Sequence, residues 1–190
     1  MKRQAQHRLA VPRPPAVRLA AIPFAVPDAR LLLGRLDAVL AVLYLICNEG
    51  YSGRAGLAAE AIRLGRVLAA LMPDEPEAHG LLALMVIHHA RRRARFCGGD
   101  LVLPGDQDRS LWDHAQIAAG RAVLDRAAAL GGRGAYLIQA VIASLQTAGP
   151  IDWPQVAGTY RRLAGLTGSA VVELNHAAAG SPRPVTPPRR

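Results

Sequence analysis

The chain has 190 residues, of which 51% are hydrophobic and 19% are charged, and its formal net charge at pH 7 is +9. This composition supplies enough apolar material for a core, so it predicts one globular domain with tails and excludes global disorder. Alanine and leucine predominate and aromatic residues make up only 4%, which favours helices over strands. The two cysteines form no CxxC pair, so neither a zinc site nor a disulfide framework is indicated.

The positive charge is concentrated at the two ends of the chain. Residues 1–30 carry +5 and residues 181–190 carry +3, which leaves +1 for residues 31–180. Basic tails either contact nucleic acid or serve as solubilising ends, and both interpretations stay open. Binding of DNA by the tails is expected to be weak, non-specific and salt-dependent. The N-terminal residues that would contact phosphates are Arg3, Arg8, Arg13 and Arg18.

Neither a secretory leader nor a membrane span is predicted. The prolines at positions 12, 14 and 15 interrupt the basic N-terminus before an apolar leader segment can form. The longest apolar run, from Ala38 to Cys47, has ten residues, whereas a span needs about 20. We therefore expect a cytoplasmic protein without membrane contact, in which this run forms a helix buried on all sides.

Prolines mark the outer limits of the predicted fold. They predict a basic Pro-rich linker over residues 1–27 and a disordered basic tail over residues 180–190. Residues 28–179 form the predicted helical domain, in which breakers separate stretches of helical periodicity. The expected helices cover about residues 29–48, 57–71, 75–95, 111–130, 135–147, 153–166 and 170–179.

Local signals assign the ends and faces of these helices. Asp74 is predicted to cap the third helix, with Glu77 completing a capping box, while Ser110 and Asp152 are predicted to cap the fourth and sixth. Residues 101–103 are expected to form one strand of a small hairpin. In the second helix, a leucine-rich face at spacings of three and four is expected to be buried. It consists of Leu57, Ala61, Leu64, Leu68 and Leu71.

Helix ends recur in a way that indicates a repeat. Leu71, Leu130 and Leu166 each precede a short breaker and another helix, and the last two are 36 residues apart, close to the tetratricopeptide period of about 34. Short connections make successive helices antiparallel. The predicted fold class is therefore all-α, with about seven helices in antiparallel hairpins stacked as a tetratricopeptide-like array.

The sequence contains no motif that indicates catalysis, a cofactor or a metal. P-loop, G-x-S-x-G and G-x-G-x-x-G patterns are missing. The segment from Asp106 begins like a calcium loop, but Leu111 replaces the required glycine and Ile117 the bidentate glutamate. We therefore expect a protein that is not an enzyme. The arginines at 91–95 are interpreted as complementing a helix dipole, with an RNA-binding patch as the less favoured alternative.

Several short motifs keep a fixed order along the chain. They are Ile22–Pro27, Ala38–Ile46, Asn48–Tyr51, Ala59–Leu64, Pro73–Glu77, Gly80–Met85, Asp106–Ser110 with Trp112–Asp113, Asp152–Pro154 and Val171–Asn175. In this order they resemble the tetratricopeptide-like C-terminal domain of extracytoplasmic-function sigma factors, over about residues 20–178. The two promoter-binding domains that precede this extension in such sigma factors are not in the sequence, so we expect a truncated or split sigma factor or a gene remnant.

The resemblance implies a non-enzymatic transcription module that contacts sigma-factor core domains or RNA polymerase. The alternative is a free-standing helical-repeat scaffold that binds a peptide or protein partner. The seventh helix has no following partner, so its apolar residues Val171, Val172 and Leu174 are expected to be exposed and to promote homodimerisation. The candidate interaction residues are Asn48, Glu49, Tyr51, Asp106, Asp108, Arg109, Trp112, Asp113 and Asn175.

Overall fold

The computed structural model describes residues 34–51 and 56–181. The predicted linker, the arginines at 3, 8, 13 and 18, and the tail beyond Ser181 lie outside the described residues. The chain divides into two units after Leu36, and the described residues from Asp37 onward form the helical array.

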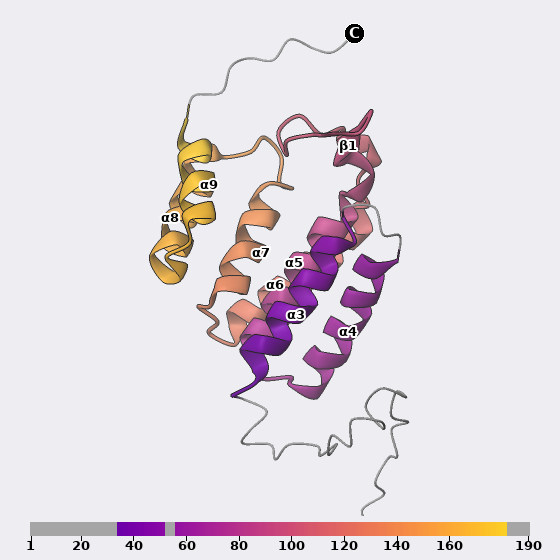
Figure 1. The fold of residues 1–190 in the computed structure, drawn as a ribbon, viewed down its shortest axis with the longest axis vertical. Coiled ribbons are helices and arrows are strands. Elements are labelled where there is room, and N and C mark those ends of the chain that lie inside the picture. Colours follow the sequence, from indigo (N-terminus) through magenta and orange to yellow (C-terminus); the bar gives the residue numbers. More distant parts are fainter. Residues whose placement is uncertain (1–33, 52–55, 182–190) are drawn as a thin grey trace, which may run out of the picture. The chain divides into compact units, whose positions relative to one another are not determined.

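The described residues contain seven α-helices, which confirms the predicted all-α class (Figure 1). A short connection rich in turns joins the third of these helices to the fourth; it holds two 3₁₀ turns, η1 (Arg92–Ala94) and η2 (Arg109–Leu111), and the strands β1 (Phe96–Cys97) and β2 (Asp100–Leu101). The α-helices are α3 (Leu36–Glu49), α4 (Leu57–Leu71), α5 (Pro76–Ala90), α6 (His114–Ala129), α7 (Ala135–Leu145), α8 (Trp153–Thr167) and α9 (Ala170–Gly180).

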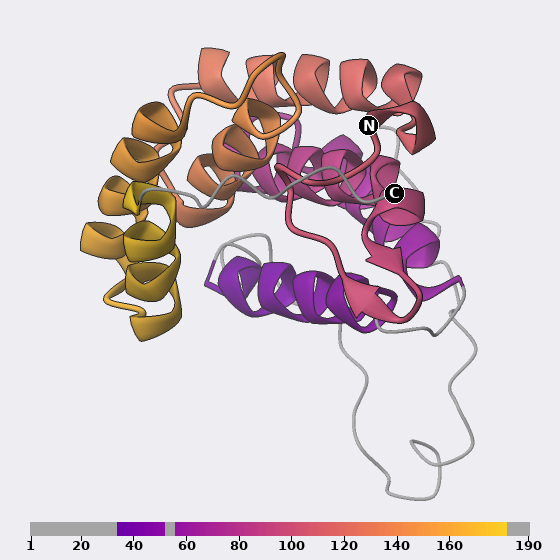
Figure 2. The same ribbon diagram turned by 90° about the horizontal axis from the view of Figure 1, so that it is seen from above.

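Helix α5 is the centre of the array. It packs against α4, α6 and α7, while α7 also contacts α8, which pairs with α9. The view from above shows α5 between α3 and α6 (Figure 2). Every residue from Gly80 to Ile87 is buried, because neighbouring helices cover α5 on several sides. In the described part of the chain, no helix has the length and apolar character needed to cross a bilayer.

Glycines allow two of these helix crossings to be close. A Cβ atom at Gly80 of α5 would lie 2.7 Å from the backbone nitrogen of Leu137 in α7. A Cβ atom at Gly120 of α6 would lie 2.6 Å from a side-chain carbon of Ile87 in α5. Both separations are shorter than carbon contacts allow, so the absence of a side chain at these positions sets the distance between the helices.

The boundaries of α4 are as predicted, but of its predicted buried face only Ala61 is fully buried. Leu57, Leu64 and Leu68 are only partly buried, and Leu71 is 75% exposed. The face that packs against α5 instead consists of small residues and one isoleucine, because these permit a close approach. Its members are Ala58, Ala61, Ile62, Gly65 and Ala69.

The prediction that α3 is buried on all sides is also wrong. The described helix begins at Leu36 because Gly34 and Arg35 form a turn, and glycine disfavours helix. One stripe is buried, formed by Leu40, Leu43 and Cys47. The opposite side carries exposed apolar residues, which we call the α3 outer face: Val39, Val42 and Leu45, which are 43%, 54% and 62% exposed.

Two of the predicted helix caps are displaced. Glu75, not Asp74, caps α5 by accepting a hydrogen bond from the backbone nitrogen of Glu77 at 3.2 Å. Asp113, not Ser110, caps α6 by accepting from the backbone nitrogen of Gln116 at 2.9 Å. In both cases the helix begins after the predicted cap residue. Helix α5 begins at Pro76, and α6 begins only after the η2 turn.

One of the remaining local predictions is confirmed, and another is right in part. Asp152 caps α8 with a 2.9 Å hydrogen bond to the nitrogen of Gln155. The small hairpin is present, with Phe96 opposite Leu101 and Cys97 opposite Asp100. Its second strand is Asp100–Leu101, so of the predicted residues 101–103 only Leu101 belongs to it. Gly98 and Gly99 form its two-residue turn with φ of 62° and 94°, a conformation that glycine adopts without strain.

Candidate functional site

The segment from Asp106 to Asp113 connects the hairpin to α6. Its acidic residues form hydrogen bonds with neighbouring parts of the chain. Asp108 accepts hydrogen bonds from the backbone nitrogen and the hydroxyl of Ser110, at 2.9 and 2.7 Å, which lowers the pKa of its carboxyl. The backbone nitrogen of Asp113 donates to Ala90 at the end of α5, at 2.9 Å. The backbone nitrogen of Asp106 closes a turn with Leu103. These contacts fix the path of the connection.

Trp112 and Arg109 anchor the same segment. Trp112 is 5% exposed and packs with Ala90, Ala94 and Ile117. The guanidinium of Arg109 lies 5.1 Å from the centre of the Trp112 ring and donates a 2.9 Å hydrogen bond to the carbonyl of Ala148. Arg109 therefore ties the start of α6 to the connection between α7 and α8.

Tyr51, at the end of α3, lies at the centre of a second set of contacts. Its hydroxyl accepts from the thiol of Cys47 at 3.4 Å, and the Arg95 guanidinium lies 4.4 Å from its ring centre. Burial raises the pKa of Tyr51, so the phenol is neutral. The carbonyl of Asn48 accepts from the Tyr51 backbone nitrogen, and Glu49 is exposed. Through the Tyr51–Arg95 contact, the end of α3 packs against the residues that follow α5.

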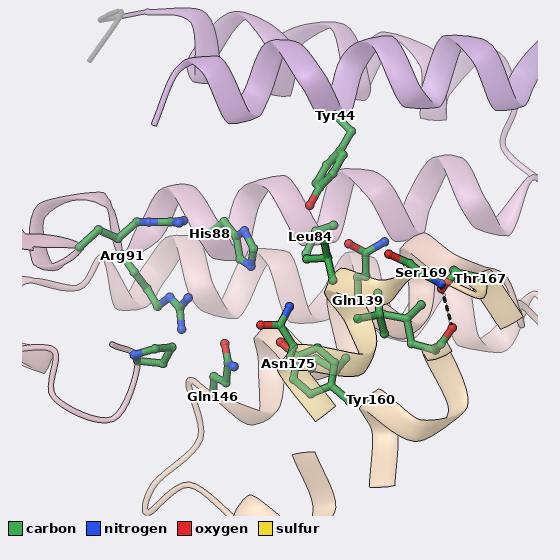
Figure 3. Close-up of a pocket in the computed structure, with 16 residues that line it drawn as sticks. Tyr44, Leu84, His88, Arg91, Gln139, Gln146, Tyr160, Thr167, Ser169 and Asn175 are labelled. Carbon is green, nitrogen blue, oxygen red and sulfur yellow. Dashed lines mark hydrogen bonds between the residues drawn. The ribbon is translucent and has the colours of Figure 1, made fainter. Parts of the chain in front are cut away.

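A pocket of about 510 Å³ lies between α3, α5, α7, α8 and α9 (Figure 3). Of the described candidate residues predicted from the sequence, Asn175 is the one that lines it. Figure 3 shows His88 of α5, and Arg91 directly after that helix, reaching into the pocket. They lie across from Gln146, which follows α7, and Asn175 of α9. Tyr44 of α3 enters from a further side.

The pocket has a positively charged end. Arg91 is only 3% exposed, and its Nε and Nη1 atoms have no hydrogen-bond partner, as is the case for Nη1 of Arg95. Burial and the neighbouring Arg95 lower the pKa of Arg91 to about 10, so it remains charged at neutral pH. Burial, together with the positive charges of Arg91 and Arg95, lowers the pKa of His88 well below its usual range, so His88 is neutral. None of the described residues that line the pocket is Asp or Glu.

The opposite walls of the pocket are uncharged. Leu84, Ile142 and Leu163 provide apolar surface. Tyr160 and Gln146 add polar groups, and burial raises the pKa of Tyr160. The sequence analysis placed Arg91 among the arginines at 91–95 that complement a helix dipole and did not predict that it lines a pocket. Arg92 donates to the carbonyl of His89 at 3.1 Å, at the end of α5, whereas Arg91 is buried and lines the pocket.

Elsewhere in the described ranges, no group of three or more histidine, cysteine or acidic side chains is placed to hold a metal ion. At the C-terminal end of the array, α9 exposes Val171 at 67% and Leu174 at 69%. Val171 and Leu174 are therefore exposed as predicted, whereas Val172 is partly buried against the core formed by α7 and α8.

Comparisons with known proteins identify a family and a related protein, neither of which has an assigned activity. Residues 35–128 match a family described as a family of unknown function (DUF6596). The chain is 44% identical over 179 residues to an uncharacterized protein of Rhizobium meliloti (strain 1021), in an alignment that covers 88% of this chain and 42% of that protein. The chain thus spans less than half of that relative's length. No solved structure matches the chain.

Proposed function

We propose that this chain is the C-terminal helical-repeat module of an extracytoplasmic-function sigma factor, and that it acts in the cytoplasm without catalysis. Its role is to contact sigma-factor core domains or RNA polymerase through the α3 outer face. The observation that carries the proposal is this face, because Ala38–Ile46 is one of the ordered motifs that resemble the sigma-factor extension, and three of its large apolar residues are exposed.

Two further observations support an interaction role. The relative from Rhizobium meliloti extends well beyond the 42% of its length that aligns, so there a helical module of this kind is part of a longer chain. Exposed apolar residues adjacent on one helix face are typical of surfaces that another protein covers. Val42 and Leu45 are neighbours at a spacing of three on α3, and Val39 precedes Val42 by the same spacing.

A free-standing scaffold that holds a peptide in its inner groove has less support. The chain's own α3 lies alongside α5 on the side away from α6 (Figure 2). The ring of Tyr44 from α3 packs edge-on against Tyr136 of α7, with the ring centres 5.7 Å apart. This helix therefore occupies space that an extended peptide would need.

The experiment is co-purification of the full chain with RNA polymerase and, separately, with the two sigma-factor core domains of the same bacterium. We expect retention of the chain by at least one of them. The variants Val42→Asp and Leu45→Asp should reduce retention at least about tenfold, because a charge would be buried in the contact.

Leu71→Asp is the matched control. Leu71 is 75% exposed and belongs to a different helix, α4, so the same substitution there should leave retention unchanged. If neither polymerase nor the core domains retain the wild-type chain, the proposal is wrong. Equal losses in all three variants would show that the contact does not involve the α3 outer face.

A further inference from the structure

We propose that the pocket between α3, α5, α7, α8 and α9 binds a small organic anion, whose carboxylate or phosphate group lies against Arg91 and Arg95. This inference goes beyond the transcription role and does not depend on it, because it rests on the chemistry of the pocket alone.

The first argument is the uncompensated charge of Arg91. A buried cation is costly unless it is paired and hydrogen-bonded. Arg91 is 3% exposed and two of its three nitrogens lack a hydrogen-bond partner. The charged group that most affects its pKa is another cation, Arg95, which also has an unpartnered buried nitrogen. A bound anion would provide both the missing charge and the missing acceptors.

The second argument is that both guanidinium groups are held in place by aromatic rings. Arg95 lies over the ring of Tyr51 at 4.4 Å, and Arg91 lies 6.0 Å from the centre of the Trp112 ring. Such contacts orient a guanidinium without using its N–H donors. The donors therefore remain available to an oxyanion, which arginine binds through paired N–H groups.

The third argument concerns the rest of the ligand. The volume of about 510 Å³ lies in the range of small-molecule sites, which are mostly apolar with a few placed polar groups. Tyr44, Leu84 and Tyr160 provide ring and aliphatic surface, while Gln139 and Asn175 provide amide donors and acceptors. These walls fit an organic group attached to the anion. The positive charge of Arg91 and Arg95 would repel a metal cation.

The test is calorimetric titration of the full chain with four probes. Phenyl phosphate and benzoate carry the two anionic groups on a ring, benzamide is a neutral analogue, and inorganic phosphate lacks the ring. We expect saturable one-to-one binding of at least one ring-bearing anion, with benzamide and inorganic phosphate at least about tenfold weaker. Equal binding of benzamide, or no binding by either ring-bearing anion, would overturn the proposal. Inorganic phosphate as tight as phenyl phosphate would show an ion site only, and would overturn it as well.

Arg91→Met and Arg93→Gln form the matched pair of variants. Arg93 is an exposed arginine two residues away that does not line the pocket, so Arg93→Gln should bind the anion as the wild type does. Arg91→Met should weaken binding at least about tenfold while raising the thermal midpoint of the ligand-free protein, because it removes an unpaired buried charge. A purely structural arginine would give the opposite change in midpoint.

Arg95→Met repeats the binding test at a less buried position, in case Arg91→Met does not fold. It should also weaken binding of the ring-bearing anion. Unchanged affinity in this variant and in Arg91→Met would place the anion elsewhere and overturn the proposal.

Discussion

The carboxylate of Glu77 in α5 accepts hydrogen bonds from the backbone nitrogens of Tyr136 and Leu137, at 2.9 and 3.1 Å. These nitrogens belong to the first turn of α7, where N–H groups have no partner within the helix and negative charge is favourable. Gly134 leaves room for the carboxylate, since a Cβ atom there would overlap it. Glu77 therefore caps α7. The prediction that it completes a capping box in its own helix, α5, is wrong.

Replacing Glu77 should destabilise the junction between α5 and α7. Glu77→Ala leaves two partly buried N–H groups without an acceptor, so we expect the free energy of unfolding to fall by ~1–3 kcal/mol. Glu77→Gln keeps one acceptor oxygen and should cost less. Urea unfolding followed by circular dichroism measures both. Glu75→Ala, which removes only the cap of α5, is the control; an equal or larger loss there would contradict the special role of Glu77.

The same carboxyl group should make stability depend on pH. Burial raises the pKa of Glu77 by more than the hydrogen bonds from Tyr136 and Leu137 lower it. The folded chain therefore binds this proton more tightly than the unfolded chain does. The contribution of Glu77 to stability is full below the unfolded pKa of about 4.3 and declines as the pH rises through the folded pKa. The stability difference between wild type and Glu77→Gln should widen from pH 7 to pH 4; a narrowing would contradict the direction of the pKa shift.

Two glycine-to-alanine substitutions should have opposite effects. Gly80→Ala places a methyl group 2.7 Å from the Leu137 backbone nitrogen, which cannot move without shifting α7, so a loss of ~1–3 kcal/mol is expected. Gly165→Ala in α8 meets no atom within 4 Å, and higher helix propensity should stabilise it by ~0.5–1 kcal/mol. Thermal unfolding of both variants makes the comparison, and a stabilised Gly80→Ala would show that α5 and α7 are not closely packed.

The two thiols should differ in reactivity. Cys47 is 1% exposed, and burial raises its pKa, whereas Cys97 is exposed on β1. The thiolate is the reactive form, so a chromogenic disulfide reagent at pH 8 should titrate Cys97 rapidly and Cys47 only after unfolding. Cys97→Ser should remove the fast phase. A fast phase that persists in this variant would mean that α3 opens readily from the array.

Self-association should involve α9. Val171 and Leu174 are 67% and 69% exposed on α9 at a spacing of three, and exposed apolar residues on one helix face promote association. Sedimentation equilibrium should show a concentration-dependent dimer, and Leu174→Glu should weaken it at least about tenfold. The control is Leu71→Glu on α4, which should not. A monomer at all concentrations would rule out this interface.

Local sequence signals were sufficient to locate the helices. The bounds of α4, the Asp152 cap of α8 and the presence of a small hairpin were all predicted. Each depends on residues a few positions apart, whose propensities and hydrogen bonds act within one turn of the chain. The all-α class follows from these local preferences and from short connections.

The tertiary structure decided which side of each helix is buried and what its charges contact. The α3 run is apolar on every side, so its sequence could not show that Val42 and Leu45 would remain exposed. Glu77 meets a helix 59 residues later, and Arg91 turns into a pocket whose other walls come from α3, α7, α8 and α9. The sequence specified these helices because their determinants are local, whereas burial and pairing depend on surfaces that only folding brings together.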